Sequence, residues 1–418
     1  MKKKYYKFTK INHSTLIVGI DIGKNTHYGY LRTLLYDGSK SFPFSNTKEG
    51  FEQLIKRIKQ FEAKHKTTNV IIGLESTGSY WLPLAYYLKQ NTHYQLVQIN
   101  GKHTKRFKDV TDNTSRKTDQ KDPRVIAQII LIGSSLRVSL PEGDKAVIRE
   151  LTRSRKAILE DKKRAQNRLL RYLSQYFPEF EKLFKDITCK TALYLLKEYP
   201  NPDDILKTNE GQLISELRKL SRGRFTAEKV KQLITYSKDS IGIKQGIEAY
   251  EMSLLIQIEQ VEFALKKIQE IENRIKAKLV RISEYYILKS IKGLGDMTIA
   301  TIISEVGDFA RFRNTHELEK YSGLNLVENS SGRHYGQKRI SKIGNEHLRC
   351  ALYFGVLRMI KKGGVYYEVY QKHLEKGMKK KKAIIVISKK MLRTIHSLVK
   401  NEQMFELKYI DTTYHQAA

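Results

Sequence analysis

The chain has 418 residues, 40% of them hydrophobic, which predicts two or three domains with buried cores. Lys and Arg exceed Asp and Glu by 77 − 44 = 33, and a surplus of this size favours a polyanionic partner, most often nucleic acid. AT-rich coding would favour Lys over Arg, but it does not explain the scarcity of acidic residues. The two cysteines, Cys189 and Cys350, have neither zinc nor disulfide spacing, which indicates a reducing compartment.

The N-terminus and the apolar runs exclude two kinds of segment. The basic N-terminus precedes a short apolar run that Asp21 interrupts, so it makes a poor signal peptide. No stretch reaches the ~18 apolar residues of a membrane span. We therefore expect a cytoplasmic, nucleoid-associated protein with no membrane partner.

The first third of the chain alternates strand and helix patterns. It predicts, in chain order, a strand hairpin over 15–22 and 27–31 with a further edge strand, a helix over 47–64, a strand over 69–74, a helix over 80–88, a strand over 94–99, a polar basic loop over 100–117 and a helix over 125–132. This order indicates a layered α/β domain over residues 12–135.

The middle of the chain, residues 142–285, is predicted to be helical. Apolar residues recur by fours and threes from Leu254 to Leu279, with Glu272 breaking the seam. This spacing fits a coiled coil or a long helix packed in one bundle, and it leaves open whether the partner helix is in cis or in trans. Residues 286–400 form a glycine-rich, mainly α-helical unit with a basic helix over 383–398, and residues 401–418 form a tail.

Four carboxylates occupy positions from which they can converge. Asp21 and Glu75 end apolar strands, and Asp119 and Asp122 stand three residues apart at a helix start. Such a cluster would repel itself unless a divalent metal neutralised it, and hard oxygen ligands suit Mg²⁺ or Mn²⁺. Each position alone is a weak signal, because a strand-end Asp often forms a turn, Glu75 fits a surface residue, and Asp122 before Pro123 is a good helix start.

Two motifs stand out in the C-terminal third. Gly293 and Gly295, in SIKGLGDMTIA, resemble the turn of a helix-hairpin-helix that approaches phosphate, although a tight turn without a ligand has the same pattern. Ser330 and Ser331 precede a cluster of cations that could hold a phosphate: Arg333, Lys338, Arg339 and Lys342. By residue type alone, Ser-Ser-Gly is more often a flexible loop.

Together these motifs resemble the DEDD transposase family of bridge-RNA insertion sequences and Piv-type DNA invertases. Its KTD-x-x-D run is present with Pro123 in place of the usual small residue, and Leu326 stands where many relatives carry proline. The S-G…G…I-x-K-x-G…L-R…L signature is matched, in order, by Ser331, Gly332, Gly336, Ile340, Lys342, Gly344, Leu348, Arg349 and Leu352.

The resemblance implies a fold and a set of site residues. It implies an RNase H-like (RuvC-like) domain in which Asp21, Glu75, Asp119 and Asp122 are catalytic metal ligands, and a C-terminal domain in which Ser331, preferred to Ser330, attacks DNA. It also implies donor and target DNA, a structured guide RNA and a homo-oligomer. The +33 charge agrees with an RNA partner but agrees equally with DNA alone.

Three alternatives remain at this point. A RuvC-like nuclease would use water and would not need Ser331. An actin-like ATPase would share the core and the VGIDIGKN strand end, but the later Asp-x-Gly-x-Gly phosphate loop is absent from the sequence. A non-catalytic nucleic-acid scaffold would not need complete carboxylate and serine sets.

Overall fold

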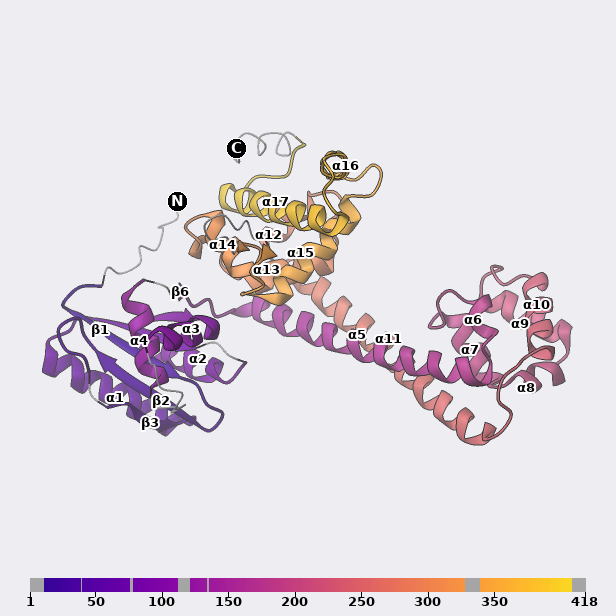
Figure 1. Ribbon diagram of the computed structural model, residues 1–418, viewed down its shortest axis with the longest axis horizontal. Coiled ribbons are helices and arrows are strands. Elements are labelled where there is room, and N and C mark those ends of the chain that lie inside the picture. Colours follow the sequence, from indigo (N-terminus) through magenta and orange to yellow (C-terminus); the bar gives the residue numbers. More distant parts are fainter. Residues whose placement is uncertain are drawn as a thin grey trace. The chain divides into compact units, whose positions relative to one another are not determined.

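The structure is a computed structural model, and it describes residues 11–38, 40–75, 78–111, 121–133, 135–327 and 339–407 (Figure 1). The chain forms two compact units. One unit joins residues 1–147 to residues 282–418, and the other comprises residues 148–281. The first unit is therefore built from both ends of the sequence.

The N-terminal part of the first unit is organised around a mixed sheet with the strand order β3-β2-β1-β4-β5-β6. β1, β2 and β3 pair antiparallel, β1, β4 and β5 pair parallel, and the short β6 closes the edge antiparallel to β5. This arrangement is compatible with the expected RNase H-like α/β domain. The strands are β1 (Thr15–Asp21), β2 (Thr26–Arg32), β3 (Phe42–Ser45), β4 (Asn69–Glu75), β5 (Gln95–Ile99) and β6 (Leu136–Arg137).

The two faces of this sheet carry separate apolar cores, because successive strand residues point to opposite faces. Leu16, Val18 and Ile20 of β1 pack into a core with the helices α1 (Lys48–His65) and α2 (Trp81–Asn91). Ile17 of β1 and Ile71 of β4 pack on the other face, against α4 (Asp122–Leu131). Both faces of the central strands are thus buried, as a parallel ladder requires.

Helix α4 lies unusually close to β1. A Cβ atom at Gly19 would lie 1.9 Å from the backbone oxygen of Pro123, in the first turn of α4. At Gly73, the residue of β4 paired with Gly19, a Cβ would meet the Cδ1 atom of Ile130 at 2.5 Å. Glycine at both positions lets the helix backbone approach the sheet.

One expected loop is a helix. The polar stretch predicted as a loop over 100–117 contains helix α3 (Gly101–Thr111), which contacts α4. Among its described side chains, Thr104 is buried and Phe107 packs against the apolar core on the α4 side of the sheet. The prediction was wrong because tertiary packing against α4, rather than a strong apolar period, supports this helix.

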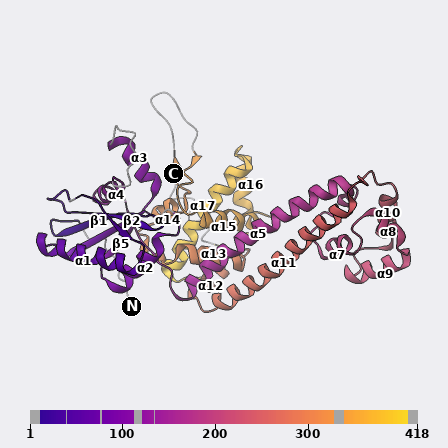
Figure 2. The same ribbon diagram turned by 90° about the horizontal axis from the view of Figure 1, so that it is seen from below.

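The second unit contains two long helices that lie side by side, with a helical module at one end that connects them in sequence (Figure 2). The long helices, α5 (Gly143–Tyr176) and α11 (Ile247–Leu279), contact each other through an Arg155–Glu272 ion pair of 2.7 Å. Glu272 interrupts the series of apolar residues in α11, and the structure shows that its carboxylate pairs with Arg155 of α5. The module comprises α6 (Phe180–Leu183), α7 (Lys190–Glu198), α8 (Pro202–Lys207), α9 (Glu210–Leu220) and α10 (Ala227–Lys238).

Most of the regularly spaced apolar residues of α11 are therefore buried by other helices of the same chain. Leu254, Ile258 and Val261 are fully buried in a core shared with α5 and the module, and Ile275 and Leu279 are also buried. Leu265, in the middle of the seam, remains 38% exposed. The partner helix is in cis, and a coiled coil between subunits stays a prediction.

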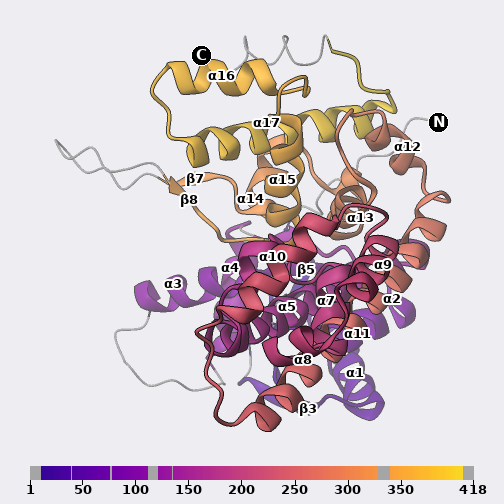
Figure 3. The same cartoon turned by 90° about the vertical axis from the view of Figure 1, so that its right-hand side faces the viewer.

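The C-terminal part of the first unit is mainly helical, as expected. Its helices are α12 (Ser283–Lys289), α13 (Asp296–Val306), α14 (Thr315–Ser322), α15 (Glu346–Met359), α16 (Tyr367–Glu375) and α17 (Lys380–Asn401), with a 3-10 turn η1 (Phe309–Arg311). The basic helix predicted over 383–398 is confirmed within α17. Two short strands, β7 (Leu326–Val327) and β8 (Arg339–Ile340), pair antiparallel (Figure 3).

An ion pair ties the start of α5 to the C-terminal helices. Lys145 donates to Glu284 at 2.8 Å and to the backbone oxygen of Gly307 at 3.3 Å. Burial alone would raise the pKa of Glu284, but the hydrogen bond and charge of Lys145 outweigh it and hold that pKa below its usual value. Among the helices in the described part of the chain, none is both long enough and apolar enough to cross a membrane.

The close approach of α4 gives a graded stability test. We expect Gly19→Ala to destabilise the α/β domain by about 1–3 kcal/mol, because the obstructing Pro123 oxygen is backbone and cannot move aside. Gly73→Ala should cost clearly less, because the end of the Ile130 side chain can rotate. Trp81, the single tryptophan, is buried in this domain, so its fluorescence during thermal unfolding measures the effect. Equal losses in the two variants would contradict the close contact.

Candidate active site

Two of the predicted metal ligands lie side by side at one edge of the sheet. Asp21 is the last residue of β1 and Glu75 the last of β4, and the parallel pairing runs from Thr15–Asn69 to Ile20–Leu74. Asp21 and Glu75 each follow the last of these paired residues, so they lie next to each other across the two strands. Both side chains are half-buried.

Both carboxylates belong to the face that α4 covers. Asp21 lies two residues after Gly19, and Glu75 lies two residues after Gly73. Since side chains alternate along a strand, each carboxylate shares the face of its glycine, which is the α4 side. Asp122, the first residue of α4, precedes the Pro123 carbonyl that contacts β1. The fold therefore directs three of the four predicted ligands to the same side of the same sheet edge.

Asp122 already has a cationic partner. Lys108 of α3 forms an ion pair with the Oδ1 atom of Asp122. The side chains of Lys108 and Asp122 are 29% and 20% exposed, so the pair is only partly screened by water. Sequence reasoning missed Lys108 because it lay in the stretch predicted as a loop.

The residue types and positions fit a divalent metal, although the cluster is incomplete in the described residues. Carboxylate oxygens at adjacent strand ends and at a helix start are hard donors that suit Mg²⁺ or Mn²⁺. Among the residues that the structure describes, no three acidic, histidine or cysteine side chains come together to hold a metal ion. The remaining predicted ligand, Asp119, lies outside the described residues, as do the neighbours from 112 to 120.

The predicted helix-hairpin-helix glycines lie in the turn between α12 and α13. Gly295 precedes the first residue of α13, and Gly293 has a φ of 96°. Cβ atoms at Gly293 and Gly295 would both lie 3.3 Å from α15, next to Met359 and Arg358 respectively. The close packing against α15 therefore explains why glycine occupies both positions. Contact of this turn with phosphate stays a prediction.

The predicted serine motif is described only at its base. Ser330, Ser331, Arg333 and Lys338 lie outside the described residues. Arg339 lies in β8 and is exposed, and Lys342 follows β8 and is also exposed, with a φ of 54°. The strands β7 and β8 hold the two ends of the segment 328–338 in register, at Val327–Arg339.

A buried polar network fixes the chain where it leaves β8. The Nδ2 atom of Asn345 donates to a carboxylate oxygen of Glu305 at 2.7 Å and to the hydroxyl of Tyr321 at 3.1 Å. The side chain of Asn345 also caps α15, accepting from the backbone nitrogen of Leu348 at 2.9 Å. Glu305 is only 2% exposed, so the hydrogen bond from Asn345 helps to offset the cost of burying its carboxylate.

Backbone packing reinforces this network. A Cβ atom at Gly344, where φ is 150°, would lie 2.4 Å from the backbone oxygen of Tyr321. The guanidinium of Arg349 donates to the backbone oxygen of Ser322 at 3.0 Å. Gly344 and Arg349 are two of the positions that matched the family signature, and here both secure the base of the β7–β8 hairpin. Sequence reasoning could have found Asn345 from its helix-capping position in GNEHL.

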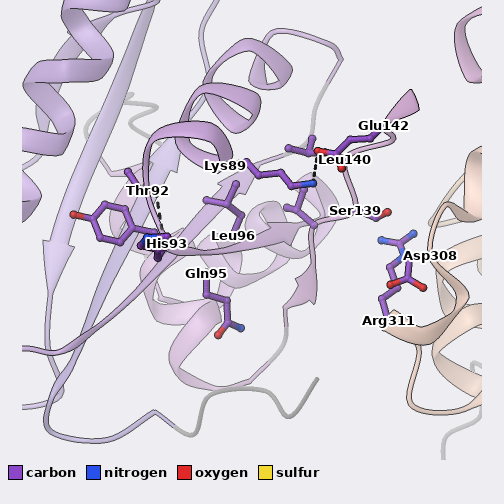
Figure 4. Close-up of a pocket in the computed structure, with 12 residues that line it drawn as sticks. Lys89, Thr92, His93, Gln95, Leu96, Ser139, Leu140, Glu142, Asp308 and Arg311 are labelled. Atoms are coloured by element: carbon purple, nitrogen blue, oxygen red, sulfur yellow. Dashed lines mark hydrogen bonds and ion pairs between the residues drawn. The ribbon is translucent and has the colours of Figure 1, made fainter. Parts of the chain in front are cut away.

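A cavity of about 430 Å³ lies away from the carboxylates (Figure 4). It opens beside the start of β5, at Gln95, whereas Glu75 lies at the end of the parallel neighbour β4. Its wall contains the Lys89–Glu142 ion pair of 2.6 Å and the side chains of Asp308 and Arg311. Since parallel strands share their carboxyl edge, this cavity is not part of the carboxylate site.

Comparison with known proteins assigns the chain to a family. A family model of DEDD transposases, described as a transposase, matches residues 18–178. A second model, described as the transposase IS116/IS110/IS902 family, matches residues 285–371. The chain belongs to this transposase family. It is therefore a transposase or recombinase, an enzyme that cleaves and transfers DNA strands.

Full-length relatives support the assignment. The chain is 22% identical to an uncharacterised 44.8 kDa protein of insertion element IS116 from Streptomyces clavuligerus, over 94% of this chain and 96% of that protein. It is also 22% identical to a pilin gene-inverting protein from Moraxella bovis, over 94% of this chain and 98% of the relative. In this transposase the two family models leave residues 179–284, most of the second unit, unmatched.

The Asn345 network can be tested by a matched pair of substitutions. Asn314 caps α14 by accepting a hydrogen bond from the backbone nitrogen of Glu317, and it is exposed. We expect Asn314→Ala to cost about 1 kcal/mol, the usual loss of a helix cap. Asn345→Ala should cost about 2–4 kcal/mol, because it also removes a donor from buried Glu305. Thermal unfolding followed by circular dichroism measures both, and equal losses would argue against the network.

Proposed function

We propose that this transposase cuts and rejoins DNA with a serine nucleophile that acts beside a divalent-metal site. The observation that carries the proposal is that Asp21 and Glu75 end adjacent parallel strands, on the face that α4 covers from its start at Asp122. A turn former or a surface acid does not need a helix packed this closely against its strand. The family match supports the same chemistry.

The proposed metal ligands are Asp21, Glu75, Asp119 and Asp122. A bound Mg²⁺ or Mn²⁺ ion would polarise the scissile phosphate and stabilise developing negative charge. The protein's own part is to hold carboxylates at fixed positions, which two strand ends and a helix start can do because their backbones are hydrogen-bonded or packed. The turn residues Gly293 and Gly295 and the cations Arg333, Lys338, Arg339 and Lys342 would bind phosphates of the DNA.

Ser331 is the proposed nucleophile. Its Oγ atom would form a bond to phosphorus while the bond from phosphorus to the leaving sugar oxygen breaks, and that oxygen takes up a proton. The phosphoserine linkage conserves the energy of the broken bond, so reversal of the step on a new sugar hydroxyl rejoins DNA. The pairing of β7 with β8 supports this role, because it holds Val327 and Arg339, which flank the serine motif in sequence, opposite each other.

The partners proposed for the reaction are donor DNA, target DNA, a structured guide RNA and further copies of the chain. The net charge of +33 supports polyanionic partners. The pilin gene-inverting name of two Moraxella relatives supports site-specific rearrangement of DNA as the outcome. A RuvC-like nuclease that uses water is the second candidate, since the carboxylate edge alone would suffice for hydrolysis.

Covalent trapping separates the two candidates. Purified protein, Mg²⁺, RNA transcribed from the gene's flanks and labelled junction DNA are mixed, denatured and examined for labelled protein. We expect an adduct that Ser331→Ala and Asp21→Asn each reduce at least a hundredfold, with Ser330→Ala as the matched control that retains it. Cleavage without an adduct, unchanged in Ser331→Ala, would establish hydrolysis by water.

The proposed guide RNA can be tested independently of the nucleophile. If flanking-region RNA selects the DNA by base pairing, replacing a loop of that RNA with its complement should abolish trapping on the original DNA and restore it on DNA changed to match. Trapping that is equally efficient without RNA, or with RNA of scrambled sequence, would show that the protein alone reads the DNA.

A further inference from the structure

We propose that Lys108 competes with the metal ion for Asp122. The lysine forms an ion pair with this carboxylate until a divalent ion displaces it. This inference rests on the proposed metal site and concerns its regulation. It starts from the ion pair between Lys108 of α3 and Asp122 of α4. Asp122 is one of the proposed metal ligands, so the Lys108 ammonium and a divalent ion would bind the same carboxylate.

The surroundings explain why a lysine belongs at this place. Asp122 begins the helix that packs against β1 beside the Asp21 strand end, and Glu75 ends the neighbouring strand. Without metal, carboxylates that share one sheet edge repel each other. A cation on Asp122 removes one negative charge from that edge, and the partial burial of the Lys108–Asp122 pair limits screening by water.

Lys108 can leave as well as stay. It lies one turn from the end of α3, and its ammonium is carried on a flexible four-carbon stem. A divalent ion on Asp122 would repel the nearby ammonium, because like charges ~4 Å apart interact by several kcal/mol even at a protein surface. Metal binding therefore requires that the ion pair opens. The affinity for metal is then lower than the carboxylates alone would give.

The neighbouring Lys105 provides a control within the same helix. Lys105 is exposed and stands three residues before Lys108, so Lys105→Met removes the same charge from almost the same region. A general electrostatic effect of losing one lysine should appear in both variants. A competitor for Asp122 should appear only in the Lys108 variant.

The test measures Mn²⁺ binding to the full chain, stripped of metal and free of nucleic acid, from the electron paramagnetic resonance signal of the unbound ion. We expect Lys108→Met to bind Mn²⁺ about three- to tenfold more tightly than the wild type, because no ion pair has to open. Lys105→Met should match the wild type, and Lys108→Arg, which keeps the charge, should bind no more tightly than the wild type.

Stability supplies a readout that does not depend on activity. In the presence of a chelator, Lys108→Met should melt at a lower temperature than Lys105→Met, as followed by Trp81 fluorescence, and Mn²⁺ should raise its melting temperature by more than it raises that of the wild type. Should Lys108→Met fail to fold, Lys108→Gln serves in its place, since it keeps length and polarity without charge.

The outcomes separate this inference from the proposed function. Mn²⁺ binding that Asp21→Asn abolishes, but that is equal in the wild type and Lys108→Met, would retain the metal site and overturn the competing role of Lys108. Mn²⁺ binding that Asp21→Asn leaves unchanged would overturn the carboxylate site, and the role of Lys108 would fall with it.

Discussion

The contact between α4 and β1 is the constraint on which the candidate site depends. Two glycines in register, Gly19 and Gly73, let the helix backbone reach the sheet, and the same two strands end two residues later in Asp21 and Glu75. The alternation of side chains then points both carboxylates toward the helix that begins with Asp122. Close packing and chemistry are thus specified by the same few residues, and a larger residue at Gly19 would move α4 away from the acidic edge.

The two halves of the proposed reaction centre are held by different physical means. The carboxylates sit at the ends of regular, fully hydrogen-bonded strands between two apolar cores. The strands β7 and β8, which flank the serine motif in sequence, are followed by a partly buried polar network that links Glu305, Asn345 and Tyr321. Removing a donor from such a network is costly, because a buried carboxylate gains little from water in exchange.

Much of the α/β domain could be predicted from sequence because its strands are short apolar runs with clear ends. Asp21 and Glu75 were found for that reason, and both lie at strand ends as expected. Helix α3 was missed because its residues are polar and its support comes from α4, which no local pattern reveals. Lys108 was missed with it. The cis pairing of α5 and α11 could not be predicted either, since the apolar seam is the same for any partner helix. In the structure, a shared apolar core and the Arg155–Glu272 ion pair identify α5 as the partner.

The first compact unit is made from two distant stretches of chain, and this has a consequence for biosynthesis. Residues 148–281 must be translated between them, and at typical rates of 5–20 residues per second this takes roughly 7–27 s. The α/β domain, with its acidic edge already formed, can therefore fold on the ribosome well before the C-terminal helices exist. A nascent or truncated chain would carry the carboxylates without the serine motif, so the complete set of reactive groups is assembled only when synthesis is nearly finished.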